Sequence, residues 1–375
     1  MRKLFYLLCT AMLCACSTPT EDRLSLSGLN PDDFVTEVNN MQTRLYTLKN
    51  KNNMEVCITN YGGRVVSVMV PDRNGKLQDV VLGFDSIADY IKYHNSYGAS
   101  IGRFANRIAN GRFSIDGTEY KVTTGKDGHC LHGGTNGFRF QVYDAELRSE
   151  NELILTYLSR DGEEGFPGNL LCKIRMTVRD DNSLDIEYEA ETDKPTVVNM
   201  TNHSFFNLDA DPTQPCLDNV LQMNAYGYTP TSNKIPTGEI VRVDNTALDF
   251  RKPRVLRDVF ADKRAGTDIA QGIDLNFVLN PGDNINHPCA KLYSPKTGIA
   301  LQVYTNEPGM QLLVSNRKKK STLKGKRGVV YSPNCSVCLE SQKYPDAPNQ
   351  PQWPTSVLRP GEKYNSRCIY KFSVE

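Results

Sequence analysis

Apolar and polar residues alternate with a period of two along most of the chain. Every second residue is apolar in segment 170–178, a polar Asp-Asp-Asn-Ser turn follows at 180–183, and the alternation resumes over residues 184–190. Such alternation is typical of strands with one buried face, and two runs joined by a short turn predict a β-hairpin. Residues 368–374 alternate in the same way and predict a closing strand.

A second hairpin is predicted over residues 113–122, where apolar residues alternate on both sides of the turn Asp116-Gly117. Helical periodicity is confined to short segments such as 86–93. Connections rich in proline, glycine and asparagine separate the strands without a strict repeat. We therefore expect an all-β fold, a large antiparallel β-sandwich with few short helices.

The amino-terminal residues predict export. A short basic end at residues 2–3 precedes an apolar run over 4–13, which is too short to span a bilayer. The run ends in Leu13-Cys14-Ala15-Cys16, which resembles the lipoprotein box of bacteria, where the cysteine after a small residue is lipidated. We expect residues 1–15 to be a signal peptide, Cys16 to carry the lipid, and the protein to be anchored to a membrane on the periplasmic or cell-surface side. A plain cleaved signal is the alternative.

Chain length and charge limit the possible domain organisation and the class of ligand. Residues 16–33 are polar, contain proline and lack periodicity, which predicts a flexible tether. Residues 34–375 are enough for one large domain with a substantial core. The chain has 44 basic and 43 acidic residues, so its small net charge argues against a nucleic-acid partner or a strongly anionic substrate. We expect a neutral small-molecule ligand and a monomer.

Eleven cysteines invite a disulfide or metal hypothesis, but only eight lie in the expected domain. Their spacing shows no compact disulfide framework, and Cys335-x-x-Cys338 lacks the second such pair that a structural zinc site requires. Cys172 and Cys368 fall on the apolar side of alternating segments, where free cysteine packs as a small hydrophobic residue. We expect most of the eight to be free, although export leaves a few disulfides open.

The sequence has no GxGxxG motif that opens a helix, and no GxxxxGK[ST], HExxH or GxSxG motif. Nucleotide-binding, zinc-protease and serine-hydrolase functions therefore have no support. Three other segments hold groups that exchange protons: His132 in Leu131-His132-Gly133-Gly134, His203 in residues 201–208, and Glu340 in residues 338–342. Both histidines have glycine- or asparagine-rich surroundings rather than an apolar stripe, which favours a functional role.

The order and spacing of several blocks resemble the aldose 1-epimerase (galactose mutarotase) family, and the resemblance covers about nine tenths of the chain. The matching blocks are Gly102-Arg103-Phe104-Ala105-Asn106-Arg107-Ile108, Leu131-His132-Gly133-Gly134, Asn202-His203-Ser204-Phe205-Phe206-Asn207-Leu208, Gly272-Ile273-Asp274, Thr322-Leu323-Lys324-Gly325-Lys326 and Cys338-Leu339-Glu340-Ser341-Gln342 with the residues up to Ala347. The resemblance implies a large twisted β-sandwich with a sugar cleft on one sheet. It also implies an isomerase that interconverts the α and β anomers of free hexoses such as galactose and glucose.

Opening a pyranose ring requires a base for the proton of the anomeric hydroxyl and an acid for the ring oxygen. The resemblance implies that Glu340 is the base at O1 and His203 the acid at O5, with no cofactor, metal or covalent intermediate. Burial would raise the pKa of Glu340, as an effective base needs, and His203 would have to hold its proton before the step.

The substrate-binding residues that the resemblance implies are Asn106, Arg107, His132, Asp274 and Gln311. They offer both donors and acceptors, which a sugar needs if none of its hydroxyls is to stay unpaired.

Two positions depart from the pattern of the family. Phe205 stands where many relatives have tyrosine, and Leu275 stands where a histidine is frequent. Both changes concern the preferred sugar more than the reaction.

Three alternatives stay open. A glycoside hydrolase would use Asp274 and Glu340 as its two carboxyl groups. A carbohydrate-binding lipoprotein would need no matched acid and base. An epimerase of phosphorylated sugars would want a basic cluster at the cleft such as Lys318-Lys319-Lys320, a run that we expect to be a solvated loop.

Overall fold

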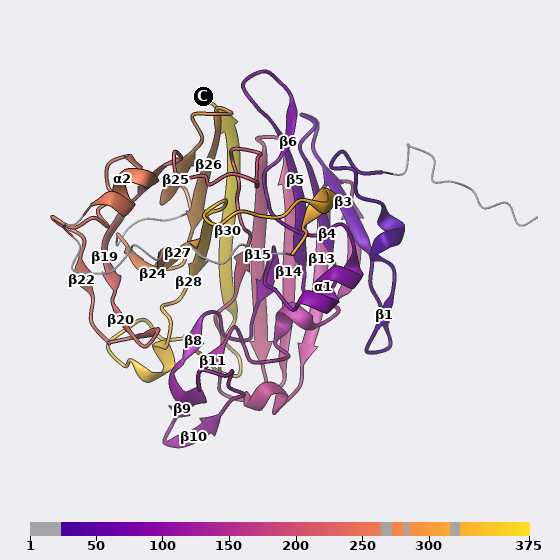
Figure 1. The fold of residues 1–375 in the computed structure, drawn as a ribbon. Coiled ribbons are helices and arrows are strands. Elements are labelled where there is room, and N and C mark those ends of the chain that lie inside the picture. Colours follow the sequence, from indigo (N-terminus) through magenta and orange to yellow (C-terminus); the bar gives the residue numbers. More distant parts are fainter. Residues whose placement is uncertain (1–23, 263, 265–271, 281–284, 316–322) are drawn as a thin grey trace, which may run out of the picture.

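The computed structural model describes residues 24–262, 264, 272–280, 285–315 and 323–375. Its largest sheet has nine strands, and the long strands of this sheet lie side by side across Figure 1. Their order is β12 (Asp144–Ser149), β13 (Glu152–Ser159), β14 (Leu170–Arg179), β15 (Ser183–Thr192), β30 (Tyr364–Val374), β26 (Ile299–Thr305), β25 (Ala290–Tyr293), β18 (Val220–Met223) and β23 (Arg254–Val255).

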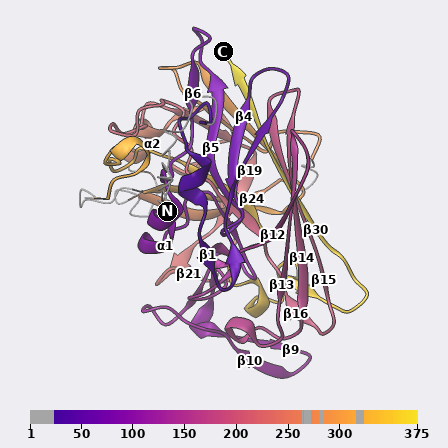
Figure 2. The same ribbon diagram turned by 90° about the vertical axis from the view of Figure 1, so that its right-hand side faces the viewer.

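Two smaller sheets complete the main architecture. In Figure 2 the strands β13, β14, β15 and β30 are seen nearly edge-on as one layer, and strands of the four-stranded sheet lie in another. The five-stranded sheet runs β22 (Val241–Arg242), β19 (Ala225–Thr229), β24 (Gly272–Leu279), β27 (Gly309–Ser315), β28 (Cys338–Gln342), and the four-stranded sheet runs β3 (Leu45–Lys49), β4 (Glu55–Thr59), β5 (Arg64–Pro71), β6 (Leu77–Asp79).

Short strand pairs and helices connect these sheets. The pairs are β1 (Glu37–Val38) with β2 (Met41–Gln42), β7 (Ala99–Ile101) with β17 (Thr201–His203), β8 (Arg107–Ile108) with β11 (Cys130–Leu131), β9 (Arg112–Ile115) with β10 (Thr118–Lys121), β16 (Thr196–Val197) with β29 (Val357–Leu358), and β20 (Thr231–Ser232) with β21 (Ile235–Pro236). The α-helices of the described residues are α1 (Ile87–Tyr93) and α2 (Leu256–Ala261). No helix in these parts of the chain is long and apolar enough to cross a membrane.

The alternating segments fold as predicted. β14 and β15 pair antiparallel over their whole length, and alternate residues of β14 from Leu170 to Val178 are buried in the core between the sheets. β9 and β10 form the hairpin around Asp116 and Gly117, and β30 closes the largest sheet between β15 and β26. These observations confirm the mainly antiparallel β fold.

The described amino-terminal residues pack against the domain. Leu29 is buried together with Phe34, and the Leu26 backbone N–H donates to the Glu55 carboxylate at 2.6 Å. The predicted tether over residues 16–33 therefore ends earlier than expected, because segment 24–33 contributes an apolar anchor and hydrogen bonds to the four-stranded sheet. The local pattern does not predict this packing, since single apolar residues between polar ones show no periodicity. Residues 1–23, which include Cys16, lie outside the described residues.

Candidate active site

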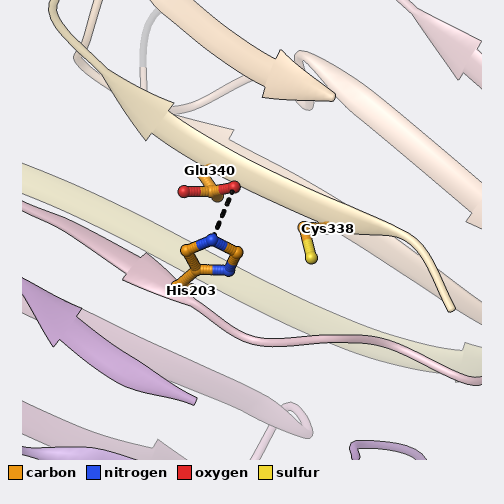
Figure 3. A group of neighbouring side chains, drawn as sticks. All are labelled: His203, Cys338 and Glu340. Carbon is orange, nitrogen blue, oxygen red and sulfur yellow. Dashed lines mark ion pairs between the residues drawn. The ribbon is translucent and has the colours of Figure 1, made fainter. Parts of the chain in front are cut away.

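His203 and Glu340 come together from strands far apart in the sequence. His203 is the last residue of β17, and Glu340 is the middle residue of β28, all five residues of which are buried. The Nε2 atom of His203 lies 3.5 Å from Oε1 of Glu340, and the two side chains are only 6% and 2% exposed (Figure 3). A titratable pair in such a dry environment is suited to proton exchange.

Burial sets the protonation of this pair. It raises the pKa of Glu340 well above its usual range, and the charge of Asp274 adds to this effect. Burial also lowers the pKa of His203 to about 3, and the positive charge of Arg139 contributes. The raised pKa of Glu340 agrees with the expectation for the base, whereas the lowered pKa of His203 disfavours the protonated form that the step requires. Both shifts favour the neutral forms, so a proton shared by the pair is favoured on Glu340 over His203.

His132 and Asn106 lie beside the pair. The His132 ring meets the His203 ring edge to face, with centroids 5.3 Å apart. The backbone N–H of Asn106 donates to Nδ1 of His132 at 3.2 Å. Burial lowers the pKa of His132 well below its usual range, and the charge of a protonated His203 acts in the same direction. His132 is therefore neutral, and because Nδ1 accepts, its Nε2 carries the hydrogen and is a donor.

Polar side chains continue across the five-stranded sheet from Glu340. In the strand register Glu340 faces Gln311 of β27, and Gln311 faces Asn276 of β24. Nε2 of Gln311 donates to Oδ1 of Asp274 at 2.6 Å, and Nε2 of Gln342 donates to Oδ1 of Asn276 at 3.2 Å. Three neighbouring strands thus present a row of acceptors and donors on one face of the sheet.

A pocket of about 460 Å³ lies at the end of this row. Four of the predicted substrate-binding residues line it, namely Asn106, Arg107, Asp274 and Gln311. Leu275, noted above as a departure from the family pattern, also lines it, and the lining residues that the sequence did not indicate as site residues are Thr229, Pro230, Thr231, Lys234, Pro236, Gly272, Asn276 and Pro345. His132, His203 and Glu340 are not among the lining residues. His132 connects to them through the hydrogen bond from the Asn106 backbone, Glu340 is the strand neighbour of Gln311, and His203 contacts Glu340. The seven predicted catalytic and binding residues therefore form one connected group.

The model of the family described as "Aldose 1-epimerase" matches residues 44–371. The chain belongs to the aldose 1-epimerase family. The chain is 40% identical to the galactose mutarotase of Homo sapiens over 322 residues, which cover 86% of this chain and 92% of that protein. It is 34% identical to the aldose 1-epimerase of Escherichia coli (strain K12) over 338 residues, 88% of this chain and 96% of the relative.

Solved structures of aldose 1-epimerase relatives agree with the fold. The GalM/aldose epimerase homologue from C. elegans superimposes with a TM-score of 0.81 at 31% identity, covering 88% of this chain and 99% of that chain. The galactose 1-epimerase from Lactobacillus acidophilus NCFM gives a TM-score of 0.78 at 28% identity, covering 90% and 97%.

The two departures from the aldose 1-epimerase pattern lie in or beside the site. The Phe205 ring stacks on the His203 imidazole, with centroids 4.8 Å apart and planes 11° from parallel, and Tyr97 packs edge to face on Phe205. Leu275 lines the pocket. Phe205 therefore fixes the plane of the His203 ring, a role that the sequence pattern did not indicate.

The cysteines in the described part of this aldose 1-epimerase family member form no disulfide bonds. All eight in the described residues are buried without a disulfide, and Cys335 and Cys338 are not bonded to each other. This agrees with the expectation for most of them. The lysine run 318–320 lies outside the described residues.

Proposed function

We propose that this protein is an aldose 1-epimerase that interconverts the α and β anomers of free hexoses, with galactose and glucose as the first candidates. The observation that carries the proposal is the buried contact between His203 and Glu340 beside a polar pocket. The relatives named galactose mutarotase and aldose 1-epimerase, which align over most of the chain, support the reaction class.

In the proposed mechanism Glu340 takes the proton of the anomeric hydroxyl while His203 protonates the ring oxygen. The reaction starts when the single proton of the pair moves from Glu340 to His203, as the incoming sugar hydroxyl donates to the carboxylate and stabilises its charge. Rotation about the C1–C2 bond and the reverse transfers close the ring on the other face. Since closure reverses opening, one shared proton is sufficient, and only protein side chains take part.

We infer that Asn106, Arg107, His132, Asp274 and Gln311 hold the hydroxyl groups of the sugar. The neutral His132 donates through Nε2, Arg107 donates, and Asp274 accepts. Asp274 is held in place by the 2.6 Å hydrogen bond from Gln311. These contacts hold the anomeric carbon in a fixed orientation relative to His203 and Glu340. This orientation increases the rate in addition to the effect of proton transfer.

Polarimetry on freshly dissolved α-D-glucose and α-D-galactose tests the proposed function. We expect relaxation to the anomeric equilibrium well above the buffer rate, and the two rates rank the sugars. Release of new reducing ends from an aryl glycoside would support the hydrolase alternative instead. Binding of sugar without acceleration would support the carbohydrate-binding alternative.

The pH dependence of kcat/KM follows from the shifted pKa values. The pair is active while it holds one proton, so activity falls at low pH only where His203 also becomes protonated, with a pKa of about 3. It falls at high pH where Glu340 loses its proton, at a pKa well above the usual value. After subtraction of the buffer-catalysed rate, we expect no loss of kcat/KM between pH 6.5 and 5 and no alkaline fall centred near pH 6.5. A histidine with its usual pKa of about 6.5 in the role of acid would instead give an alkaline fall near that value.

Asp274→Asn checks the assignment of the binding residues. The substitution keeps the shape of the side chain and removes its charge, so a sugar hydroxyl loses a charge-assisted acceptor. We expect KM to rise by about tenfold or more with a smaller change in kcat. An unchanged KM would remove Asp274 from the binding set.

We further propose that the protein is an exported lipoprotein with its lipid on Cys16. The basic end, the short apolar run and the Leu-Cys-Ala-Cys sequence support this proposal. Because Leu26 is already hydrogen-bonded to Glu55, the link between Cys16 and the domain would end before Leu26. Cys16→Ser should release the protein from the membrane fraction, and mass spectrometry of the wild-type amino-terminal peptide should show the acyl chains. A full-length, unacylated amino terminus would contradict this proposal.

A further inference from the structure

Cys338 is a buried thiol next to the proton-transfer pair, and the proposed mechanism does not use it. Cys338 and Glu340 are alternate residues of β28, so their side chains point to the same face of the strand. Figure 3 shows both side chains on the side of β28 where His203 lies. One ligand atom from each of His203, Cys338 and Glu340 lies within 4.8 Å of the other two.

The geometry is close to that of a metal site. Ligand atoms around tetrahedral zinc, at about 2.0–2.3 Å from the ion, lie roughly 3.3–3.8 Å from one another. The His203 Nε2 to Glu340 Oε1 distance of 3.5 Å already meets this requirement. The Cys338 sulfur needs a movement on the order of 1 Å, which side-chain rotation supplies.

A second observation points to a ligand. Oε2 of Glu340 is buried and has no hydrogen-bond partner in the described part of the structure. A buried carboxyl oxygen without a partner is costly, and a metal ion bound to the ionised group or a substrate hydroxyl would satisfy it. The pocket lies next to the cluster in the sheet, because its lining residue Gln311 is the strand neighbour of Glu340.

We propose that His203, Cys338 and Glu340 bind one Zn²⁺ ion, and that this ion inhibits the enzyme. One imidazole nitrogen, one thiolate and one carboxylate are three ligands that zinc accepts, and the fourth position stays open for water. Binding releases the thiol proton of Cys338 and the proton held by Glu340 to solvent. The two resulting negative charges balance the two charges of the ion, which limits the cost of burying it.

Inhibition follows because the ion occupies the acid and the base together. This part rests on the proposed function, whereas metal binding itself does not. Sugar and zinc compete for Glu340, so galactose should raise the zinc concentration that gives half inhibition.

The test is titration of the reduced, chelator-treated protein with Zn²⁺ and with Co²⁺ as a spectroscopic substitute. We expect one ion per chain, and with Co²⁺ a thiolate-to-cobalt charge-transfer band in the near ultraviolet. Cys338→Ser should abolish the band and weaken zinc binding by about 10²-fold or more, since changes even in the outer shell of metal sites cost 10–100-fold. Glu340→Gln should weaken zinc binding as well while leaving the thiol in place.

Cys335→Ser is the matched control, because Cys335 is also buried and lies three residues before Cys338, outside the cluster. It should keep both the band and the affinity. No stoichiometric zinc in the wild type would overturn the proposal even if Cys338→Ser failed to fold. A band lost in Cys335→Ser and kept in Cys338→Ser would also overturn it. Zinc binding in a protein without mutarotase activity would leave the metal site standing and reject the proposed function alone.

Discussion

Glu340→Gln is expected to lower kcat for mutarotation by about 10²- to 10⁴-fold, because glutamine keeps the shape of the side chain but cannot take a proton. His203→Asn should cause a loss of similar size, since it removes the partner that protonates the ring oxygen. Polarimetry with both variants measures the effect. The double variant should fall little below either single variant, because the two residues act as one unit.

Stability separates loss of chemistry from loss of fold. Burial raises the pKa of Glu340, so above its usual pKa the unfolded chain gains free energy by ionising this group more readily than the folded chain does. The destabilisation grows as the pH rises from the unfolded pKa to the folded one. Glu340→Gln should therefore be at least as stable as the wild type in urea denaturation at neutral pH. A variant that loses activity and stability together would not support the assignment of Glu340 as the base.

Glu307→Gln is the matched control for Glu340→Gln, because it should lower stability and leave kcat unchanged. Glu307 is also buried, but its carboxylate accepts from Tyr364 at 3.2 Å and lies 3.3 Å from Nζ of Lys343. Its substitution weakens a satisfied buried contact, so stability should fall while kcat stays near the wild-type value. An activity loss in Glu307→Gln equal to that in Glu340→Gln would mean that any buried charge change disturbs the site.

The strands that could be predicted from the sequence are those with one buried face. β14 alternates because its even-numbered residues face the core and its odd-numbered residues face outward or the edge of the core. β4 and β28 have no exposed face, since all five residues of each are buried, so their sequences lack the alternation that marks a strand with one buried face. The pairing of β27 with β28 depends on contacts between distant segments, which a local pattern does not contain.

The candidate site was predictable as a set of residues but not as a geometry. Motif blocks named His203, Glu340 and the residues around the pocket. They did not show which residue of the pair holds the proton, because that depends on the burial created by the folded sheets. The motif blocks also did not distinguish residues that line the pocket from residues that support it. Arg103 belongs to the second kind, because it lies in a motif block and is buried without lining the pocket.

Arg103→Met is expected to lower the free energy of unfolding by at least about 3 kcal/mol. The Arg103 side chain is buried, and its two terminal nitrogens donate six hydrogen bonds to carbonyl and hydroxyl oxygens. The acceptors are the carbonyls of Ser159, Arg160, Pro167 and Gly168 and the hydroxyls of Ser159 and Thr196. Methionine fills much of the volume but leaves the carbonyl groups without a donor. Arg103→Lys should recover only part of the loss, because an ammonium group has three donors and cannot reproduce the planar fork.

The same substitution should reach the active site through the backbone. The N–H of Asn199 donates to the Arg103 carbonyl at 3.0 Å, and the Ala105 N–H donates back to Asn199 at 2.8 Å. This link joins the segment that ends in Asn106 and Arg107 to the strand that ends in His203. We expect KM to rise in Arg103→Lys, in which the fold is better preserved. Arg112→Met is the control, because Arg112 is exposed and pairs with Glu119 at the surface, so its loss should change stability by less than about 1 kcal/mol. Equal losses in the free energy of unfolding for the Arg103 and Arg112 variants in urea denaturation would contradict this role. The buried hydrogen bonds of Arg103 would then not hold the segment of Asn106 and Arg107 to the segment of His203.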